Sequence, residues 1–140
     1  MKKIINIIIL PILAFSSLDI SKINNALSSI QSSSSLSEPL KFYSTSKQLD
    51  LMEKLHFTSR NNADIILFPK KKKIQKAFVV DSYGALKEYE QSIGAIYIKK
   101  GRTQIIFVRE RLENNGFDMT KTSNKYIIRE CQLRSICLQK

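Results

Sequence analysis

The sequence has 140 residues, of which 23 are lysine or arginine and 12 are aspartate or glutamate, giving a formal net charge of +11. This length corresponds to one domain, which can bury a hydrophobic core without a framework of several disulfides. The positive charge predicts anionic partners, and the single histidine, His56, has no clustered ligands around it, which argues against a zinc site.

The N-terminal residues 1–16 have the pattern of a signal peptide. Lys2 and Lys3 precede an apolar run of about 12 residues, Ile4 to Phe15, and Ala14-Phe15-Ser16 resembles an A-x-A cleavage site. A membrane-spanning helix needs roughly 20 residues, so the pattern favours cleavage after Ser16 and a mature chain without a transmembrane helix. We therefore expect a periplasmic or secreted protein, in which nucleic acid is the least accessible anion and is not an expected partner. Retention of the segment as an anchor is left open.

Residues 17–37 are predicted to be a serine-rich linker. Apolar side chains recur there at helical spacing, at Ile20, Ile23, Leu27 and Ile30, which indicates a short amphipathic helix over residues 18–30. The serine tract Gln31–Ser37 has too little apolar surface to become ordered by itself. We therefore expect a single compact domain over residues 38–140.

The compact domain is predicted to be α/β, with a mixed sheet flanked by helices in the order β-α-β-β-α-β-β-α. Its apolar runs have the near-continuous character of strands covered on both faces, and segments with helical periodicity separate them. The strand–helix–strand start favours a parallel pair, and the turn at Gly101 predicts a hairpin. The predicted strands cover residues 40–43, 63–68, 77–80, 93–98 and 103–108, and the predicted helices cover residues 47–57, 82–91 and 109–115. A last short helix or strand is expected within residues 125–133.

Cys131 and Cys137 are predicted to form a disulfide. An even pair of cysteines in an exported chain usually pairs, and the spacing matches neither a redox CxxC motif nor a haem-binding CxxCH motif. Six residues turn a straight helix by about 240° net, so the segment must bend if the bridge forms. The alternative is two free thiols near a frayed terminus.

The sequence contains no motif that predicts catalysis. It has no nucleophile–base pair, paired carboxylates, Walker loop or G-x-S-x-G motif, and Gly101 is not part of a glycine-rich phosphate cradle. We therefore expect a protein that is not an enzyme and that needs no cofactor and no metal.

Two strand-to-helix junctions are candidate anion sites, because ligands of open α/β sheets bind beyond the carboxyl ends of strands, where helix N-termini offer free N–H groups. One junction is Ser44-Thr45-Ser46 and the other is Ser82-Tyr83, although the carboxylate of Asp81 opposes an anion at the second. Positive charge could come from Lys70–Lys73 and from Arg102. The alternative is that these hydroxyls are ordinary helix caps and that the lysines form a solvated loop.

Two segments, Asn62–Phe68 and Ile93–Arg102, resemble one lobe of periplasmic substrate-binding proteins of the phosphate-binding type, and the order of the elements over residues 63–117 is similar. The resemblance implies capture of a small solute, often an oxyanion, for an importer or a sensor. Those proteins close two lobes around the ligand, whereas this chain has the length of one. The resemblance therefore implies a degenerate or partner-dependent relative.

These observations favour an exported, non-enzymatic domain that binds a small anionic solute or a partner protein of the envelope. The alternative is a structural or interaction protein of the cell envelope that uses its basic surface against acidic lipid or polymer. A small hydrolase is a third candidate. A solute binder requires a concave pocket with convergent polar groups, a surface binder requires a basic face without one, and a hydrolase requires a perturbed titratable group in a cleft.

Overall fold

The computed structural model describes residues 18–34, 38–46 and 52–137. The predicted signal peptide and residues 47–51 of the predicted helix at 47–57 lie outside these residues. The described strands are β1 (Ile30–Ser32), β2 (Lys41–Ser44), β3 (His56–Phe57), β4 (Ile65–Leu67), β5 (Ala77–Val80), β6 (Ser92–Lys99), β7 (Arg102–Val108), β8 (Phe117–Met119) and β9 (Ile127–Ile128). The described helices are α1 (Ile20–Ser28), α2 (Tyr83–Glu88), α3 (Arg109–Asn114) and α4 (Glu130–Leu133), with 3-10 turns η2 (Arg60–Asn62) and η3 (Lys121–Tyr126). None of these helices is both long enough and apolar enough to cross a membrane.

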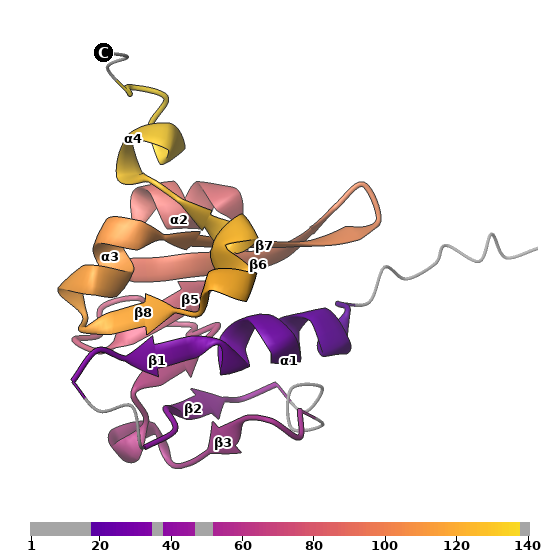
Figure 1. Cartoon of the computed structure of the whole chain (residues 1–140), viewed down its shortest axis with the longest axis vertical. Coiled ribbons are helices and arrows are strands. Elements are labelled where there is room, and N and C mark those ends of the chain that lie inside the picture. The colour runs from indigo at the N-terminus through magenta and orange to yellow at the C-terminus, as the bar shows by residue number, and fades with distance from the viewer. Residues whose placement is uncertain (1–17, 35–37, 47–51, 138–140) are drawn as a thin grey trace, which may run out of the picture.

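Within the described residues, seven strands form one mixed sheet in the order β3-β2-β4-β5-β6-β7-β9 (Figure 1). The strands from β3 to β6 run parallel, whereas β7 is antiparallel to β6 and parallel to β9. All residues of β4 and β5 are buried, as expected for parallel strands covered on both faces. The predicted α/β class, the mixed sheet with flanking helices, and the hairpin around Gly101 are confirmed.

Hydrophobic clusters lie on both faces of the sheet. The larger cluster joins the sheet, through residues such as Phe107, to Leu27 of α1 and to the antiparallel pair β1–β8. The smaller cluster joins Phe78 of β5 to Leu86 of α2 and Leu133 of α4. In Figure 1, α1, β1 and β8 cross the front of the sheet and α2 lies behind it. The sheet is therefore the middle layer of the molecule.

The first described residues belong to this core. The helix expected within residues 18–30 forms as α1, and Ile23, Ala26 and Leu27 on its inner face are fully buried in the larger cluster. Ile30 starts β1, which pairs with β8, so the chain from Leu18 to Ser32 packs with residues 38–137. A linker over residues 17–37 followed by a domain starting near Glu38 was expected because the stretch is rich in serine. Burial of the apolar face of α1 and the pairing of β1 with β8 hold this stretch in the fold despite its serine content.

The prediction of a helix running to Phe57 is wrong for its described part. Residues 52–55 form a turn, and His56 and Phe57 form the edge strand β3 beside Lys41 and Phe42 of β2. Met52 and Leu55, expected on the helix's apolar face, are still buried. Pairing with β2 gives the backbone of β3 hydrogen-bond partners in the sheet. A short isolated helix is only marginally stable, so strand pairing is favoured over the helical pattern.

A β-bulge in β6 interrupts its regular pairing with β5. Phe78 pairs with Ser92 and Val79 pairs with Gly94, so Ile93 is an extra residue in the ladder. Ile93 is buried in the larger cluster. A Cβ atom on Gly94 would meet the carbonyl oxygen of Ile106 at 2.5 Å and Cδ1 of Phe107 at 2.5 Å. The close approach of β6 to β7 therefore requires glycine at position 94.

We expect Gly94→Ala to destabilise the fold by about 3 kcal/mol, because backbone atoms must shift to accommodate one methyl group. Urea unfolding measures the change. Gly84→Ala is the matched control, since a Cβ on Gly84, in helix α2, meets no described atom within 4 Å. The control should be neutral or more stable by up to about 1 kcal/mol. Equal unfolding free energies for the two variants would show that β6 and β7 are not this close.

Candidate functional site

A hollow with basic side chains lies at the carboxyl ends of the neighbouring parallel strands β2 and β4. Its volume is about 320 Å³. We call it the basic hollow, and its lining consists of Tyr43, Thr45, Arg60, Ile66, Leu67, Phe68, Pro69, Lys70 and Lys71. This end of a parallel sheet is where α/β proteins place their ligands. The hollow is therefore the candidate functional site.

The parallel register of β2 and β4 brings the parts of the hollow together. Ser44 pairs with Leu67, so Thr45, which follows β2, lies beside the turn that begins at Phe68. Arg60 comes from η2, whose position is held by the ammonium group of Lys76. Lys76 Nζ donates hydrogen bonds to the carbonyl oxygens of Arg60 and Ala63 at 3.1 and 2.9 Å. Residues separated in sequence by up to 28 positions, from Tyr43 to Lys71, thus converge on one hollow.

The turn that leads out of β4 has an unusual backbone. Phe68 has φ = 54°, in the left-handed region that residues with bulky side chains rarely adopt. Its N–H donates to the carbonyl oxygen of Val79 at 2.9 Å, so the turn is tied to β5. Pro69 follows and is buried. This strained turn redirects the chain and places Lys70 and Lys71 at the mouth of the hollow.

All charged residues that line the basic hollow are positively charged. Arg60, Lys70 and Lys71 each carry a positive charge and are exposed, and none of the lining residues is acidic. The nearby carboxylate of Asp64 accepts a hydrogen bond from the N–H of Lys41 at 2.8 Å. The phenol of Tyr43 and the hydroxyl of Thr45 add hydrogen-bonding groups. Such a set of donors can bind a small oxyanion and contains no pair suited to nucleophilic catalysis.

The structure brings only some of the predicted site residues to the hollow. Thr45 lines the hollow, whereas Ser44 and Ser46 are not lining residues. These two serines flank Thr45 in the chain, and the N–H of Ser46 donates a hydrogen bond to Ser44 Oγ at 3.0 Å. The helix expected after Ser46 begins in residues outside the described part of the chain. The predicted contribution of a helix N-terminus at this junction therefore stays a prediction.

The second predicted junction has a structural role in α2. Ser82 is the N-cap of α2, and its Oγ accepts the N–H of Ala85 at 3.0 Å. The hydroxyl of Tyr83 donates to the carbonyl oxygen of Leu133 at 3.4 Å. Neither residue lines the basic hollow. Ser82 is therefore an ordinary helix cap, as the alternative interpretation of this junction expected.

Arg102 also lies away from the basic hollow. It starts β7 opposite Lys99, at the tip of the β6–β7 hairpin, and it is exposed. Four strand spacings separate β7 from β2, a distance of about 19 Å across the sheet. Lys72, from the predicted basic loop, turns elsewhere as well, with its ammonium 5.4 Å from the centre of the Tyr89 ring. Of the basic residues predicted for the site, Lys70 and Lys71 therefore line the hollow, and Arg60 adds a third positive charge.

Arg60 is not among the site residues predicted from the sequence. Arg60 stands before β4 in the chain, and no local pattern indicates that its side chain reaches the carboxyl end of β2. The short extended segment from Thr58 to Ser59 that follows β3 determines this path, and β3 itself was not predicted. A list of all basic residues near predicted strand ends would have contained Arg60, but together with many others and with no signal to distinguish it.

A second cluster of charged residues, also missed, fastens the C-terminal segment. Arg111 is 5 % exposed, and its guanidinium binds both carboxylate oxygens of Glu130 at 2.8 and 2.7 Å. The same guanidinium donates to the carbonyl oxygens of Leu86 and Ser92 at 2.7 and 3.0 Å. Arg111 therefore joins the end of α2, the start of β6, α3 and α4. It also satisfies carbonyl oxygens where α2 stops at Glu88, short of the predicted Gln91.

The carboxylate of Glu130 is fully compensated in this cluster. The hydrogen bond from Arg111 and, secondarily, the charges of Arg111 and Arg134 hold the pKa of Glu130 below its ordinary value of 4.5, although partial burial opposes the shift. A lowered pKa and a paired charge are signs of a structural ion pair. They do not fit the perturbed acid that the hydrolase alternative requires.

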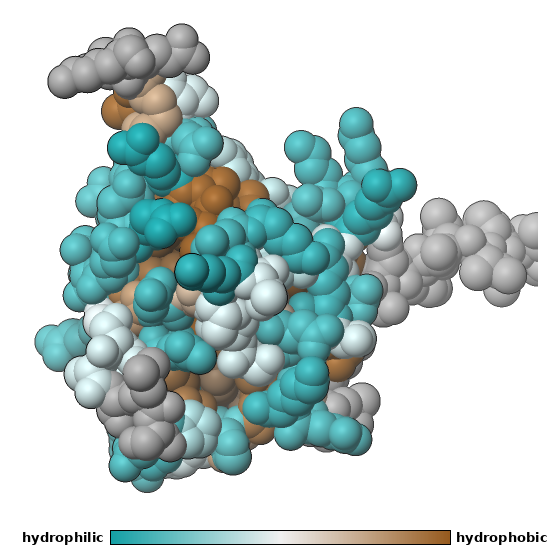
Figure 2. Space-filling model, viewed as in Figure 1, coloured by the Kyte–Doolittle hydropathy of each residue, from teal (hydrophilic) through white to brown (hydrophobic). Residues whose placement is uncertain are grey.

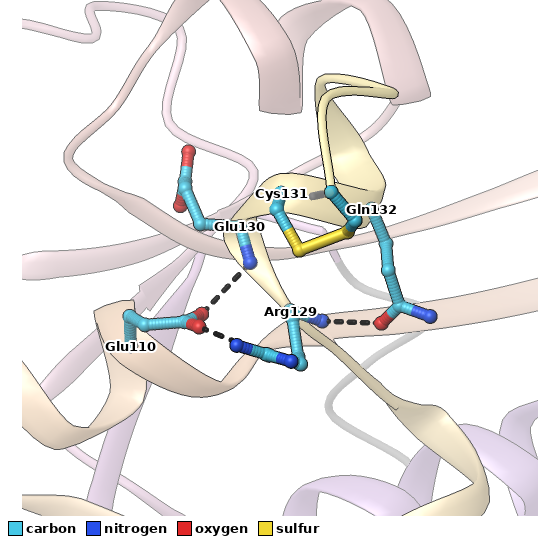
Figure 3. Close-up of a disulfide and its surroundings, with 6 residues drawn as sticks. Glu110, Arg129, Glu130, Cys131 and Gln132 are labelled. Carbon is cyan, nitrogen blue, oxygen red and sulfur yellow. Dashed lines mark hydrogen bonds and ion pairs between the residues drawn. A yellow bond between two sulfur atoms is a disulfide. The ribbon is translucent and has the colours of Figure 1, made fainter. Parts of the chain in front are cut away.

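The predicted disulfide between Cys131 and Cys137 is confirmed and closes the C-terminal segment on itself (Figure 3). The segment bends as expected, because α4 ends at Leu133 and Ser135 has φ = 54°. Figure 3 shows how Glu110 approaches from α3: it accepts the N–H of Glu130 at 2.8 Å and faces Arg129. The N–H of Arg129 donates to Gln132 at 2.7 Å. Disulfide and hydrogen bonds thus hold one short helix.

Metal binding has no support in the described part of the chain. No group of three or more His, Cys, Asp or Glu side chains lies there in a position to hold a metal ion. His56 is an exposed residue of β3.

We expect Glu130→Gln to lower the free energy of unfolding at neutral pH, because the buried guanidinium of Arg111 loses its charged partner. The folded pKa of Glu130 is below its ordinary value of 4.5, so the stabilisation is complete above that pH and is lost as the pH falls through the folded pKa. The difference from wild type should therefore shrink in acid. Urea unfolding across pH measures it. Glu113→Gln, on the exposed side of α3, is the control and should show little difference at any pH; identical behaviour of the two variants would contradict the ion pair.

The candidate site rests on the geometry of the basic hollow. Its residues come from β2, η2 and the turn after β4, and Thr45 is the predicted residue among them. Comparison with protein families, with curated proteins and with solved structures gives no match for this chain.

Proposed function

We propose that this protein is an exported, non-enzymatic α/β domain that binds a small oxyanion in the basic hollow. The observation that carries the proposal is the convergence of Arg60, Lys70 and Lys71 on the carboxyl ends of two parallel strands, beside the hydroxyl of Thr45. Phosphate and sulfate are the simplest ligands of this chemistry. Arginine can donate two parallel hydrogen bonds to such an anion, and lysine adds point charges.

The size of the basic hollow supports a small ligand. Its volume of about 320 Å³ is at the lower end of the range for small-molecule sites, which runs from about 300 to 1,000 Å³. Ile66 and Leu67, both buried, are the lining residues at the end of β4, and their side chains belong to the clusters on the two faces of the sheet. The three basic side chains are exposed, so the hollow faces solvent. We expect moderate affinity that a covering partner would raise.

The resemblance to one lobe of phosphate-type binding proteins points to the same ligand class. A single lobe provides half of a closing cleft, which agrees with a hollow that is open on one side. Within this proposal, the chain presents an anion to a partner protein of the envelope or senses it with that partner.

Two features support export. The pattern of Lys2, Lys3 and the apolar run to Phe15 is typical of a signal peptide. The Cys131–Cys137 disulfide is the form that cysteine pairs adopt in oxidising compartments such as the periplasm.

A second candidate function is attachment to the cell envelope through basic surface. The observation that favours it is the group of exposed cations at the tip of the β6–β7 hairpin: Lys99, Lys100 and Arg102. This group is about 19 Å from β2 across the sheet, so it can act independently of the basic hollow.

We expect titration with phosphate or sulfate, followed by calorimetry, to give saturable binding to the wild-type protein. Arg60→Gln should weaken binding by about tenfold or more, because a charge-assisted hydrogen bond contributes roughly 1.5 to 3 kcal/mol. Lys70→Gln/Lys71→Gln should also weaken it, and Thr45→Ala should have a smaller effect. The matched control is Lys99→Gln/Lys100→Gln, which removes the same charge from the hairpin tip and should leave the affinity unchanged.

Salt separates a site from diffuse attraction. The Debye length is about 8 Å at physiological ionic strength, so attraction to scattered lysines fades as salt rises, whereas direct hydrogen bonds persist. Binding that disappears with salt, or that the hairpin control weakens as much as Arg60→Gln does, would overturn the proposal.

A further inference from the structure

We propose that the tip of the β6–β7 hairpin is a docking surface for an anionic lipid bilayer. The hairpin tip is defined here as Ile98, Lys99, Lys100, Gly101 and Arg102. The proposal deepens the second candidate function by naming its partner, and it is independent of anion binding in the basic hollow, because none of these residues lines the hollow.

The hairpin tip extends beyond the rest of the sheet. β5 pairs with β6 as far as Ala95, and β9 pairs with β7 only at Phe107 and Val108. Between these points the two strands of the hairpin pair with each other, as far as Lys99 and Arg102. Four residues of strand from Ala95 to Lys99 span about 13 Å. Figure 1 shows the hairpin projecting from the body of the molecule.

The projecting tip concentrates positive charge. Lys99, Lys100 and Arg102 are exposed, and the sequence has no acidic residue from Ser92 to Val108. Lys100 and Gly101 have φ values of 52° and 75°, so the three cations follow one another around a tight turn. In Figure 2, hydrophilic side chains stand out from the surface where Figure 1 places the hairpin tip. Clustered basic residues are attracted to the negative surface of membranes that contain anionic lipid.

The acidic groups near the hairpin lie at its base. Asp19 Oδ1 accepts the N–H of Lys22 at 3.1 Å as the cap of α1, and Asp81 lines the hollow that Ile98 also lines. The ammonium group of Lys22, 2.7 Å from the carbonyl oxygen of Thr103, adds a further positive charge at the same place. Among the described residues, neither carboxylate forms an ion pair with Lys99, Lys100 or Arg102.

An apolar surface adjoins the cations, which favours a bilayer over a soluble polyanion. Ile98 is 38 % exposed, and the only other large exposed hydrophobic residue among the described ones is Ile136. Ile98 lines a hollow of about 360 Å³ whose other lining residues are Leu18, Phe68, Ile96, Tyr97 and one acidic residue, Asp81. Apolar side chains flanked by lysine and arginine suit the boundary between lipid headgroups and acyl chains. A water-soluble polymer offers nothing to such a surface.

The position of the first described residues supports the same orientation. The N–H of Asp19 donates to Thr103 Oγ1 at 2.8 Å, so the start of α1 is fastened to the hairpin and lies on the same side of the molecule (Figure 1). In the sequence, the apolar run that ends at Phe15 is three positions before Leu18. The hairpin tip therefore lies on the same side of the molecule as the first described residues. The tip is present whether the run is removed or kept.

The test is partition of the full chain between buffer and vesicles, measured by sedimentation at low salt. One set of vesicles is phosphatidylcholine alone and the other contains phosphatidylglycerol as well. We expect the wild type to prefer the anionic vesicles, and that preference isolates the charge-dependent part of the binding. Lys99→Gln/Lys100→Gln/Arg102→Gln should reduce the preference by roughly 100-fold, because each of the three basic residues near an anionic surface contributes about fivefold.

Matched variants test separately whether the location of the charge and the exposed apolar side chain contribute to vesicle binding. Lys70→Gln/Lys71→Gln/Lys73→Gln removes the same charge from an exposed loop and should retain most of the preference. Ile98→Ser should weaken partition into anionic vesicles, whereas Ile136→Ser, at the other exposed hydrophobic residue, should not. All four changes are at exposed positions, and thermal unfolding checks that each variant is folded.

Three results would overturn the proposal. The first is equal partition of the wild type into both kinds of vesicle, and the second is an equal loss of preference in the hairpin and loop variants. The third is binding to dextran sulfate that depends on the hairpin cations while Ile98→Ser leaves vesicle partition unchanged, because that pattern identifies a polymer surface. Phosphate titration of the same variants keeps this result separate from the proposed function, since only the loop variant changes the basic hollow.

Discussion

The close approach of β6 and β7 at Gly94 is the constraint on which much of the fold depends. The ring of Phe107 and the carbonyl oxygen of Ile106 occupy the space where a side chain would stand, so the two strands pack without an intervening Cβ. β6 is also where the sheet changes from parallel to antiparallel pairing. At its first residue, Ser92, the carbonyl oxygen accepts a hydrogen bond from Arg111, and through Arg111 the C-terminal helix joins the core. At its other end β6 continues into the projecting hairpin.

The parallel half of the sheet has a different consequence. Parallel strands all end at the same edge, so polar and basic residues that follow separate strands are brought together there. At β2 and β4 this edge gathers Thr45, Lys70 and Lys71, and η2 adds Arg60. At β5 the corresponding position is occupied by Ser82, whose hydroxyl caps α2. Among the described residues, a short helix uses the hydroxyl at the β5 junction, whereas Thr45 at the β2 junction lines the basic hollow.

The excess positive charge is distributed over separate places with different surroundings. In the basic hollow, cations surround a concave surface at the carboxyl ends of β2 and β4. On the hairpin tip, cations surround a convex turn beside the exposed side chain of Ile98. At Arg111 the charge is buried and paired with Glu130. A single net charge of +11 therefore conceals a structural ion pair and two surfaces whose shapes suit different anions.

The sequence by itself determined the α/β class, the buried strands around Ile65–Leu67 and Ala77–Val80, the hairpin, the Ser82 cap and the disulfide. Each depends on local signals: continuous apolar runs, turn residues, a capping hydroxyl and the spacing of two cysteines. Only the tertiary structure decided that Leu27 packs into the core, that His56 and Phe57 form a strand, and that Arg60 and Arg111 reach partners far away in the chain. Those outcomes depend on strand pairing and burial between distant segments, and such interactions leave no periodic pattern in the residues that make them.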